Sequence, residues 1–262
     1  MAALLPVLPG QETDQASVMA WGFDPEAMAA DPYRGAYNGV VTSLAKLVAA
    51  GADYRRAYLT LQEFFEKLRE DPARWGKPFA ALLGAPRMRH DITAGYKGEN
   101  YRSYESLIPT LAQAVREVAD YAASKGVMTM TENHGFFSQD SDRVEKLYMA
   151  VDHPNFGLLC DLGNFLCADE NPAEAVARIA PYTRYVHGKD FIVKPFYSED
   201  PGEGAFRSRG GNFLRGTIIG HGNVPVKHCL HLLKAAGFDG TIAVEFEGLE
   251  PALLFHSQLC QL

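Results

Sequence analysis

Four side chains that could bind a metal ion lie at the ends of short apolar runs in the second half of the sequence. Each run has the length and composition of a β-strand, and each ends in a carboxylate or an imidazole. If the runs are parallel strands of one sheet, their carboxyl ends share one face, where side chains far apart in sequence meet. The four residues are Glu132, Asp161, His187 and Glu245.

Three carboxylates and one imidazole form a hard set of donors that suits one divalent metal ion. Mn²⁺ is the expected ion, Mg²⁺ and Co²⁺ suit the same ligands, and Zn²⁺ is a further alternative. A single acidic residue at a strand end is more often a helix cap or a surface charge, and a single histidine is more often structural. Four such residues at the same position of successive strands favour a metal centre, because crowding their charges without a cation would be costly.

The alternation of side chains along a strand adds residues that could contact a substrate. His134 and Lys189 each follow a candidate ligand by two positions and therefore share its face. The last run contains two glutamates on one face. Glu245 lies within the apolar run and is the expected ligand, whereas Glu247 lies at the rim of the site.

The part of the chain after residue 85 alternates between strands and helices, which is the pattern of a parallel α/β sheet. Strands are expected near residues 87–91, 127–132, 156–161, 185–189 and 242–246, and helices near 104–124, 143–151, 173–179 and 227–236. Periodicity alone does not decide between an open sheet and part of a closed barrel.

The segment from Asp31 to Ala85 differs in character and predicts helices. The Asp31-Pro32 pair is a typical cap and first turn, and apolar residues then recur at helical spacing up to Gly51. A second amphipathic stretch is expected over Leu59–Leu68.

Composition excludes several classes of protein. The formal net charge of −7 argues against nucleic-acid binding, which needs a basic surface. No apolar run approaches the length that crosses a bilayer, and the N-terminal residues do not resemble a signal peptide. The four cysteines lack metal or disulfide spacing, so we expect free thiols in a reducing cytoplasm.

A long connection, from Lys194 to Val224, exceeds the usual length of a loop and is therefore expected to be functional. Its arginines, Arg209 among them, could bind a phosphate or sugar hydroxyls from a flexible loop, and a solvated basic loop is an equal alternative. His221 could support the site, but a structural turn histidine is at least as good an interpretation.

The motifs around the four strand ends carry a family resemblance: Glu132-Asn-His-Gly, Asp161-Leu-Gly-Asn, His187-Gly-Lys-Asp190 and Val244-Glu245-Phe-Glu. Over about Pro86 to Gly248 the chain resembles the sugar phosphate isomerase/epimerase family, which has a xylose isomerase-like (β/α)₈ TIM barrel. The resemblance implies one divalent ion on the four residues and proton exchange with substrate by Glu132 and Glu245. It also implies substrate contacts for Asn164 and Asp190. Ketose epimerases often have a histidine at the position of Asn164, so the substrate class stays open.

The same resemblance makes the five expected strands the fourth to eighth of the barrel. The fold class is therefore α/β, a partial (β/α)₈ TIM barrel preceded by a mainly helical fragment, with domains at residues 1–85 and 86–262. About Gly10 to Ala85 resembles an internal piece of phosphoribosylformylglycinamidine synthase. The carrying motifs include Ala20-Trp-Gly-Phe-Asp-Pro, Asp31-Pro-Tyr-Arg-Gly-Ala-Tyr and Trp75-Gly-Lys-Pro-Phe. The nucleotide-handling segment and the glutaminase part of that family do not follow, so no synthase activity is expected.

These observations predict a metal-dependent sugar or sugar-phosphate isomerase or epimerase that transfers protons through an enediolate. The alternative is a non-catalytic fusion fragment with a residual metal-binding site. Hydrolysis by an endonuclease-type relative is disfavoured by the negative charge and the four-ligand set. The expected partner is a small sugar or sugar phosphate, without nucleic acid or membrane. The exposed edges of a half-barrel would favour a homo-oligomer.

Overall fold

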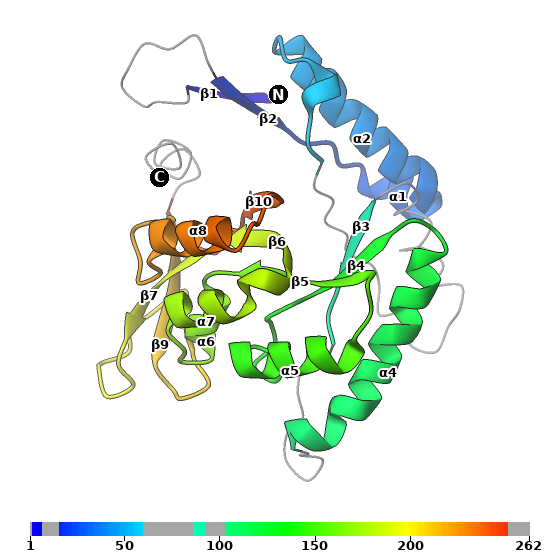
Figure 1. Cartoon of the computed structure of the whole chain (residues 1–262). Helices are drawn as coiled ribbons and strands as arrows, with labels where there is room; N and C mark the ends of the chain where they lie inside the picture. Colours follow the sequence, from blue (N-terminus) through cyan, green and yellow to red (C-terminus); the bar gives the residue numbers. More distant parts are fainter. Residues whose placement is uncertain (1, 7–15, 60–85, 93–102, 251–262) are drawn as a thin grey trace. The chain divides into compact units, whose positions relative to one another are not determined.

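The computed structural model describes residues 2–6, 16–59, 86–92 and 103–250 of the chain (Figure 1). The chain divides into two compact units, Met1–Ala85 and Pro86–Cys260. In the first unit, an antiparallel hairpin precedes two helices and a 3₁₀ turn. These elements are β1 (Ala2–Pro6), β2 (Ala16–Ala20), α1 (Pro25–Ala30), α2 (Pro32–Ala49) and η1 (Tyr54–Arg56).

The long helix of the first unit begins and ends as its sequence predicts. The Asp31 carboxylate accepts a hydrogen bond from the backbone N–H of Arg34 at 3.0 Å, and Pro32 occupies the first turn. The helix ends just before Gly51, which has a φ of +90°. The hairpin was not predicted, so the described part of this unit is not purely helical. Most of the second predicted stretch, Leu59–Leu68, lies outside the described residues.

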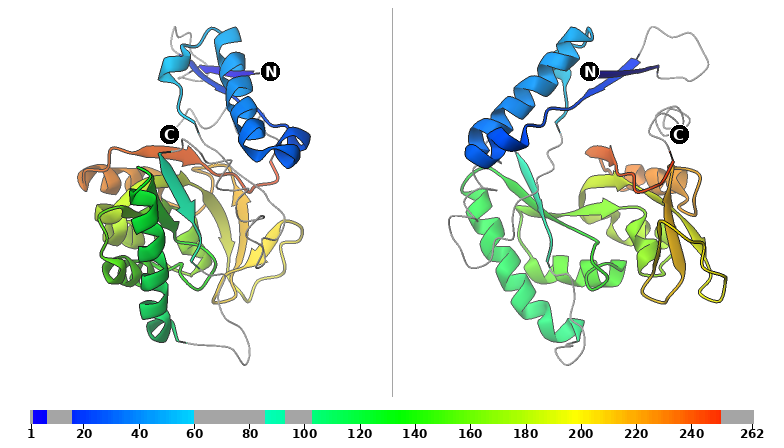
Figure 2. Two further views of the ribbon diagram at one scale, coloured as in Figure 1. Left: turned by 90° about the vertical axis from the view of Figure 1, so that its right-hand side faces the viewer. Right: turned by 180° about the vertical axis from the view of Figure 1, so that it is seen from behind.

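The second unit is built on a curled sheet of five parallel strands in the order β10-β6-β5-β4-β3. Four longer helices cover the outer face of this sheet (Figures 1 and 2). The strands are β3 (Arg87–His90), β4 (Met128–Glu132), β5 (Phe156–Asp161), β6 (Thr183–Gly188) and β10 (Thr241–Val244). The helices are α4 (Tyr104–Ala123), α5 (Ser141–Val151), α7 (Pro172–Ile179) and α8 (Val226–Ala235), with a short α6 (Asn164–Cys167) and a 3₁₀ turn η3 (Ala180–Tyr182).

All five predicted strands and all four predicted helices of this unit are present, and their ends agree within two residues. The parallel half-barrel is therefore confirmed. Its alignment with the fourth to eighth strands of a complete barrel stays a prediction. The strands β3 and β10 form the two edges of the sheet. Association of chains through these edges also stays a prediction.

The core of the unit lies between the sheet and its helices. Every residue of β5, the central strand of the sheet, is buried. Leu158 and Cys160 belong to one buried cluster with Val176 and Ile179 of α7 and Leu233 of α8. Burying each such leucine or isoleucine contributes about 1.5–3 kcal/mol. The free cysteines of the described residues, Cys160, Cys167 and Cys229, are all buried.

The long connection is an ordered sheet, which corrects the prediction of a flexible loop. Three antiparallel strands lie in the order β7-β9-β8, namely β7 (Asp190–Lys194), β9 (Phe213–Thr217) and β8 (Ala205–Arg207). Phe191 of β7 and Leu214 of β9 belong to one buried cluster with Cys167. The turns of this sheet include Gly202 and Gly211, both of which have positive φ.

Among the described residues, no helix combines the length and the apolar character that crossing a bilayer requires.

Candidate metal centre

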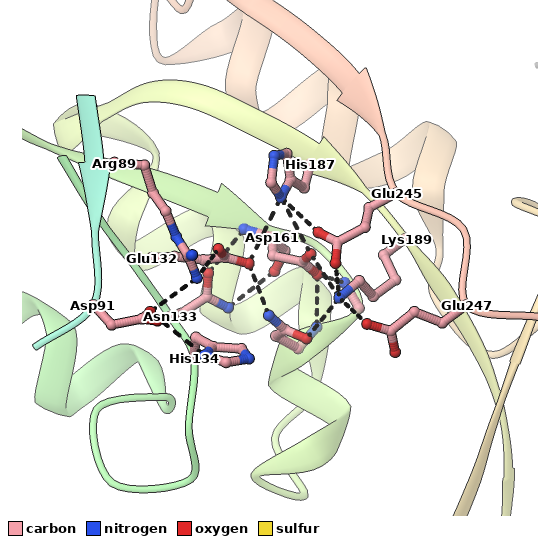
Figure 3. Close-up of polar contacts among 12 residues, drawn as sticks. Arg89, Asp91, Glu132, Asn133, His134, Asp161, His187, Lys189, Glu245 and Glu247 are labelled. Atoms are coloured by element: carbon pink, nitrogen blue, oxygen red, sulfur yellow. Dashed lines mark hydrogen bonds and ion pairs between the residues drawn. The ribbon is translucent and has the colours of Figure 1, made fainter. Parts of the chain in front are cut away.

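The structure brings the four predicted ligands together at the carboxyl edge of the parallel sheet (Figure 3). Each of the four residues offers one ligand atom, and these atoms all lie within 4.8 Å of one another. Glu132, Asp161 and His187 stand at or near the ends of β4, β5 and β6, and Glu245 follows the last residue of β10. The predicted convergence is confirmed, whereas the role of these residues as ligands stays a proposal.

The imidazole of His187 points into the space between the three carboxylates. Its Nδ1 lies 2.7 Å from Glu245 Oε2, 3.6 Å from Glu132 Oε1 and 3.8 Å from Asp161 Oδ2. The shortest of these contacts lacks the alignment of a hydrogen bond. His187 Nδ1 and Asp161 Oδ2 are buried and have no hydrogen-bond partner among the described residues. Such atoms need a partner, and a divalent cation between them would satisfy both. The site therefore fits a metal ion.

Asp161 is held in place from the backbone. Its Oδ1 accepts hydrogen bonds from the backbone N–H groups of Gly163 and Asn164, at 2.8 and 2.9 Å. The Asn133 side chain holds the Asp161 peptide in two directions, donating to its carbonyl oxygen at 2.9 Å and accepting from its N–H at 2.8 Å. Asn133 was not predicted as a site residue, although it belongs to the Glu-Asn-His-Gly motif.

Two cations stand beside the carboxylates, and only one of them was predicted. Lys189 is buried, with Nζ 2.9 Å from Glu245 Oε1, 3.0 Å from Glu247 Oε1 and 3.4 Å from Asp161 Oδ2. Arg89 places one guanidinium nitrogen 2.7 Å from Glu132 Oε2. Arg89 was missed because it lies on an edge strand without a motif. The signal that could have identified it is a basic residue just before the end of the strand beside β4.

The crowding of charge shifts the titration of the ligands. Burial raises the pKa of Asp161 to about 7, although Lys189 acts in the opposite direction. Burial alone would lower the pKa of His187, but the carboxylates of Glu132 and Glu245 outweigh burial and raise the pKa to about 9. Burial also acts to raise the pKa of Glu245, yet His187 and Lys189 hold this pKa well below its ordinary value. Without a cation, the cluster therefore retains protons near neutral pH.

Of the residues predicted to contact substrate, His134 and Asn164 lie at the centre. The His134 ring is half exposed, with Nδ1 3.5 Å from Asp91, and this hydrogen bond raises the pKa of His134. Asn164 is buried, donates to Glu132 Oε1 at 3.0 Å and accepts from Lys189 at 3.4 Å. Both ends of the Asn164 amide and the Lys189 ammonium are thus engaged by protein groups.

Three further residues that were predicted to contact substrate lie among other groups. The buried Asp190 carboxylate accepts four backbone hydrogen bonds, from Phe191, Gly220, Gly222 and Val224, and so closes the turn after β9. His221 is exposed within that turn. Arg209 forms an ion pair with Asp140 at 2.8 Å and donates to the Phe136 carbonyl oxygen. Protein groups thus engage the side chains of Asp190 and Arg209, and the substrate contacts expected of Asp190, Arg209 and His221 stay a prediction.

Comparison with known proteins supports this interpretation of the fold. A family model described as xylose isomerase-like TIM barrel matches residues 78–256. An inosose dehydratase from Clostridium botulinum is 25% identical over 147 residues, which are 52% of this chain and 46% of that protein. The chain therefore spans about half the length of the curated relatives it matches. The comparisons give no support for the resemblance of residues 10–85 to the purine-synthesis enzyme.

Two solved structures have the same fold. A probable 3-DHS dehydratase from Bacillus anthracis superposes with a TM-score of 0.61 at 16% identity, covering 90% of this chain and 84% of that one. A xylose isomerase-like TIM barrel protein from Mycobacterium smegmatis, in complex with magnesium, has a TM-score of 0.54 at 18% identity. The superposition covers 74% of this chain and 67% of that protein.

Proposed function

The chain belongs to the xylose isomerase-like TIM barrel family, and on this premise we propose that it is a metal-dependent sugar or sugar-phosphate isomerase or epimerase. The reaction is proton transfer at a carbon next to a carbonyl group, through an enediolate. The observation that carries the proposal is the convergence of three carboxylates and one imidazole on one point, with an unsatisfied buried oxygen and nitrogen among them.

In this proposal, Glu132, Asp161, His187 and Glu245 hold the ion, for which Mn²⁺ or Mg²⁺ suits the oxygen-rich donors. When bound, the ion supplies Lewis acidity toward the oxygen atoms of the substrate. The two glutamates differ in access to substrate. The side chain of Glu245 is 36% exposed, whereas that of Glu132 is 3% exposed and is paired with Arg89. Glu245 is therefore the better placed of the two to accept a proton from substrate.

Dehydration is a second candidate, favoured by the curated relatives, which are named inosose dehydratases. Removal of the same proton would then be followed by loss of a hydroxyl group from the adjacent carbon as water. That hydroxyl must first accept a proton. His134 is half exposed and its pKa is raised by Asp91, so it is the best placed side chain to donate one.

Isotope exchange with several substrate classes tests both candidates. The chain, loaded with Mg²⁺ or Mn²⁺, is incubated in D₂O with ketoses, ketose phosphates and a polyhydroxylated cyclic ketone, and products are weighed by mass spectrometry. Incorporation of deuterium at unchanged composition supports the isomerase or epimerase, and loss of water supports the dehydratase. Glu245→Gln should abolish either reaction, and Glu203→Gln, at an exposed glutamate, is the matched control. Metal binding without either reaction would favour the non-catalytic fragment.

A further inference from the structure

Each of the three carboxylates in the centre has one oxygen turned toward His187, while its other oxygen is held by a cationic side chain or by backbone N–H groups. For Asp161 the held oxygen is Oδ1, which accepts from two backbone N–H groups, while Oδ2 is left without a hydrogen bond among the described residues. The backbone thus fixes which oxygen of Asp161 faces the centre. For the two glutamates, which have longer and more flexible side chains, side-chain cations take the place of the backbone donors.

Arg89 determines which oxygen of Glu132 faces the centre. One guanidinium nitrogen lies 2.7 Å from Glu132 Oε2 and 2.8 Å from Asp91 Oδ1, so Asp91 anchors the arginine that anchors the glutamate. The other oxygen, Oε1, accepts from Asn164 and lies 3.6 Å from His187 Nδ1. Glu132 therefore has one lone pair of Oε1 left for an ion, and its Oε2 is turned away (Figure 3).

Lys189 likewise determines which oxygen of Glu245 faces the centre. Its ammonium lies 2.9 Å from Glu245 Oε1, whereas Glu245 Oε2 lies 2.7 Å from His187 Nδ1. Glu247 holds the lysine from its other side at 3.0 Å. Gly163 leaves room for the Lys189 side chain, because a Cβ at residue 163 would stand 3.0 Å from Lys189 Cγ. The lysine is thus built into the centre rather than left free to meet a substrate.

We propose that Arg89 and Lys189 are positioning residues that restrict Glu132 and Glu245 to one metal-bound oxygen each. This inference rests on the proposed function, because it concerns the same ion. Arg89 and Lys189 each hold the outer oxygen of one glutamate, so that the inner oxygen stays directed at the centre. Without these cations, both glutamate side chains would be free to rotate, and the ion would lose ordered ligands.

If Arg89 and Lys189 served charge balance alone, their removal would change the affinity for metal in the opposite direction. A positive charge near a divalent cation repels it, so removal of Arg89 or Lys189 would then raise the affinity for metal. Loss of positioning lowers the affinity instead. Removal of a residue that orients metal ligands typically costs 10–100-fold in metal affinity. The direction of the change thus separates the two explanations.

The test uses Co²⁺ with the full chain, measuring affinity by equilibrium dialysis and coordination by visible absorption. Arg89→Met and Lys189→Met should each weaken Co²⁺ binding by about 10–100-fold and change the intensity of the absorption band, because the glutamates reorient. Arg89→Lys should restore the wild-type band, since it returns a cation. Arg87→Met is the matched control, because Arg87 is an exposed arginine two residues earlier on the same strand. This control should behave as the wild type.

Unchanged or tighter binding with an unchanged band in both methionine variants would overturn the inference and leave the proposed function standing. A wild-type chain that binds no Co²⁺, Mn²⁺ or Mg²⁺ would overturn the proposed function itself. Circular dichroism of each variant identifies a loss of fold. If Lys189→Met does not fold, the comparison of Arg89→Met with Arg89→Lys still tests the inference. Arg89 lies on an edge strand and is about one-third exposed, so its substitution should leave the fold intact.

Discussion

Replacing Asn133 with alanine should destabilise the second unit far more than the loss of an ordinary polar side chain. Asn133 is 1% exposed and makes two hydrogen bonds to the peptide groups of Asp161. The alanine variant leaves the Asp161 N–H and carbonyl oxygen buried without these partners. Each unsatisfied buried group costs about 1–3 kcal/mol, so we expect a loss of about 2–6 kcal/mol in the free energy of unfolding.

Urea denaturation measures this loss. With a slope of about 2 kcal/mol/M, the midpoint should fall by about 1–3 M. Far-UV circular dichroism is the suitable probe, because the second unit contains no tryptophan: both, Trp21 and Trp75, precede residue 86. Asn171→Ala is the matched control. Asn171 caps α7 through one hydrogen bond to Ala173, and its loss should cost about 1 kcal/mol.

A midpoint for Asn133→Ala that equals that of the wild type or of Asn171→Ala would refute the reasoning. It would mean that the Asp161 peptide finds other partners, and that the contact between the ends of β4 and β5 is incidental. A large shift accompanied by weaker metal binding would instead show that the same side chain holds both the strand end and the ligand.

Three further predictions follow from particular contacts. Metal affinity should rise with pH up to about 9, because the metal-free centre holds protons on His187, with a pKa of about 9, and on Asp161, with a pKa of about 7, which the ion must displace. Calorimetry in buffers of different protonation enthalpy should accordingly detect proton release at neutral pH, and affinity independent of pH would contradict this. Asp190→Ala should destabilise the chain by at least about 3 kcal/mol, since four backbone N–H groups lose their acceptor. Asp190→Asn, which keeps one acceptor oxygen, should cost less in the same urea titration. Gly163→Ala should cost about 1–3 kcal/mol and weaken metal binding, because its Cβ would press on Lys189, and an unchanged unfolding midpoint would oppose that.

The sequence predicted the parallel strands well because most of them are short runs of apolar and β-branched residues beside a glycine, a proline or a polar strand end; β3, Arg-Met-Arg-His, is the exception. The ligands followed from topology, since the carboxyl ends of parallel strands share one face. Side-chain partners did not follow in the same way. Asp190 binds backbone N–H groups, whereas its neighbour Lys189 binds carboxylates. This difference depends on the path of the turn after β9, and the periodicity of the sequence does not encode that path.

The antiparallel sheet was missed for a different physical reason. Its strand β8 has only three residues, and glycines and arginines surround it, so neither a period of two nor an apolar run stands out. The strands are stabilised by packing of Phe191, Leu214 and Phe206, which are distant in sequence. Arg89 was missed on similar grounds, because only the pairing of β3 with β4 brings it beside Glu132.

The charges of the centre explain why it can hold either protons or a metal ion. Five carboxylates, those of Asp91, Glu132, Asp161, Glu245 and Glu247, are faced by two permanent cations, Arg89 and Lys189. This leaves an excess of negative charge, which is costly at Glu132 and Asp161 because these two carboxylates are buried. The raised pKa values of His187 and Asp161 show that protons can supply part of the missing positive charge. A divalent ion would supply it by taking the place of those protons among the carboxylate oxygens that face His187. Glu245 needs no ion to be ionised, because His187 and Lys189 already hold its pKa well below the ordinary value. Binding of the ion would therefore displace protons from His187 and Asp161 and leave the charge of Glu245 unchanged.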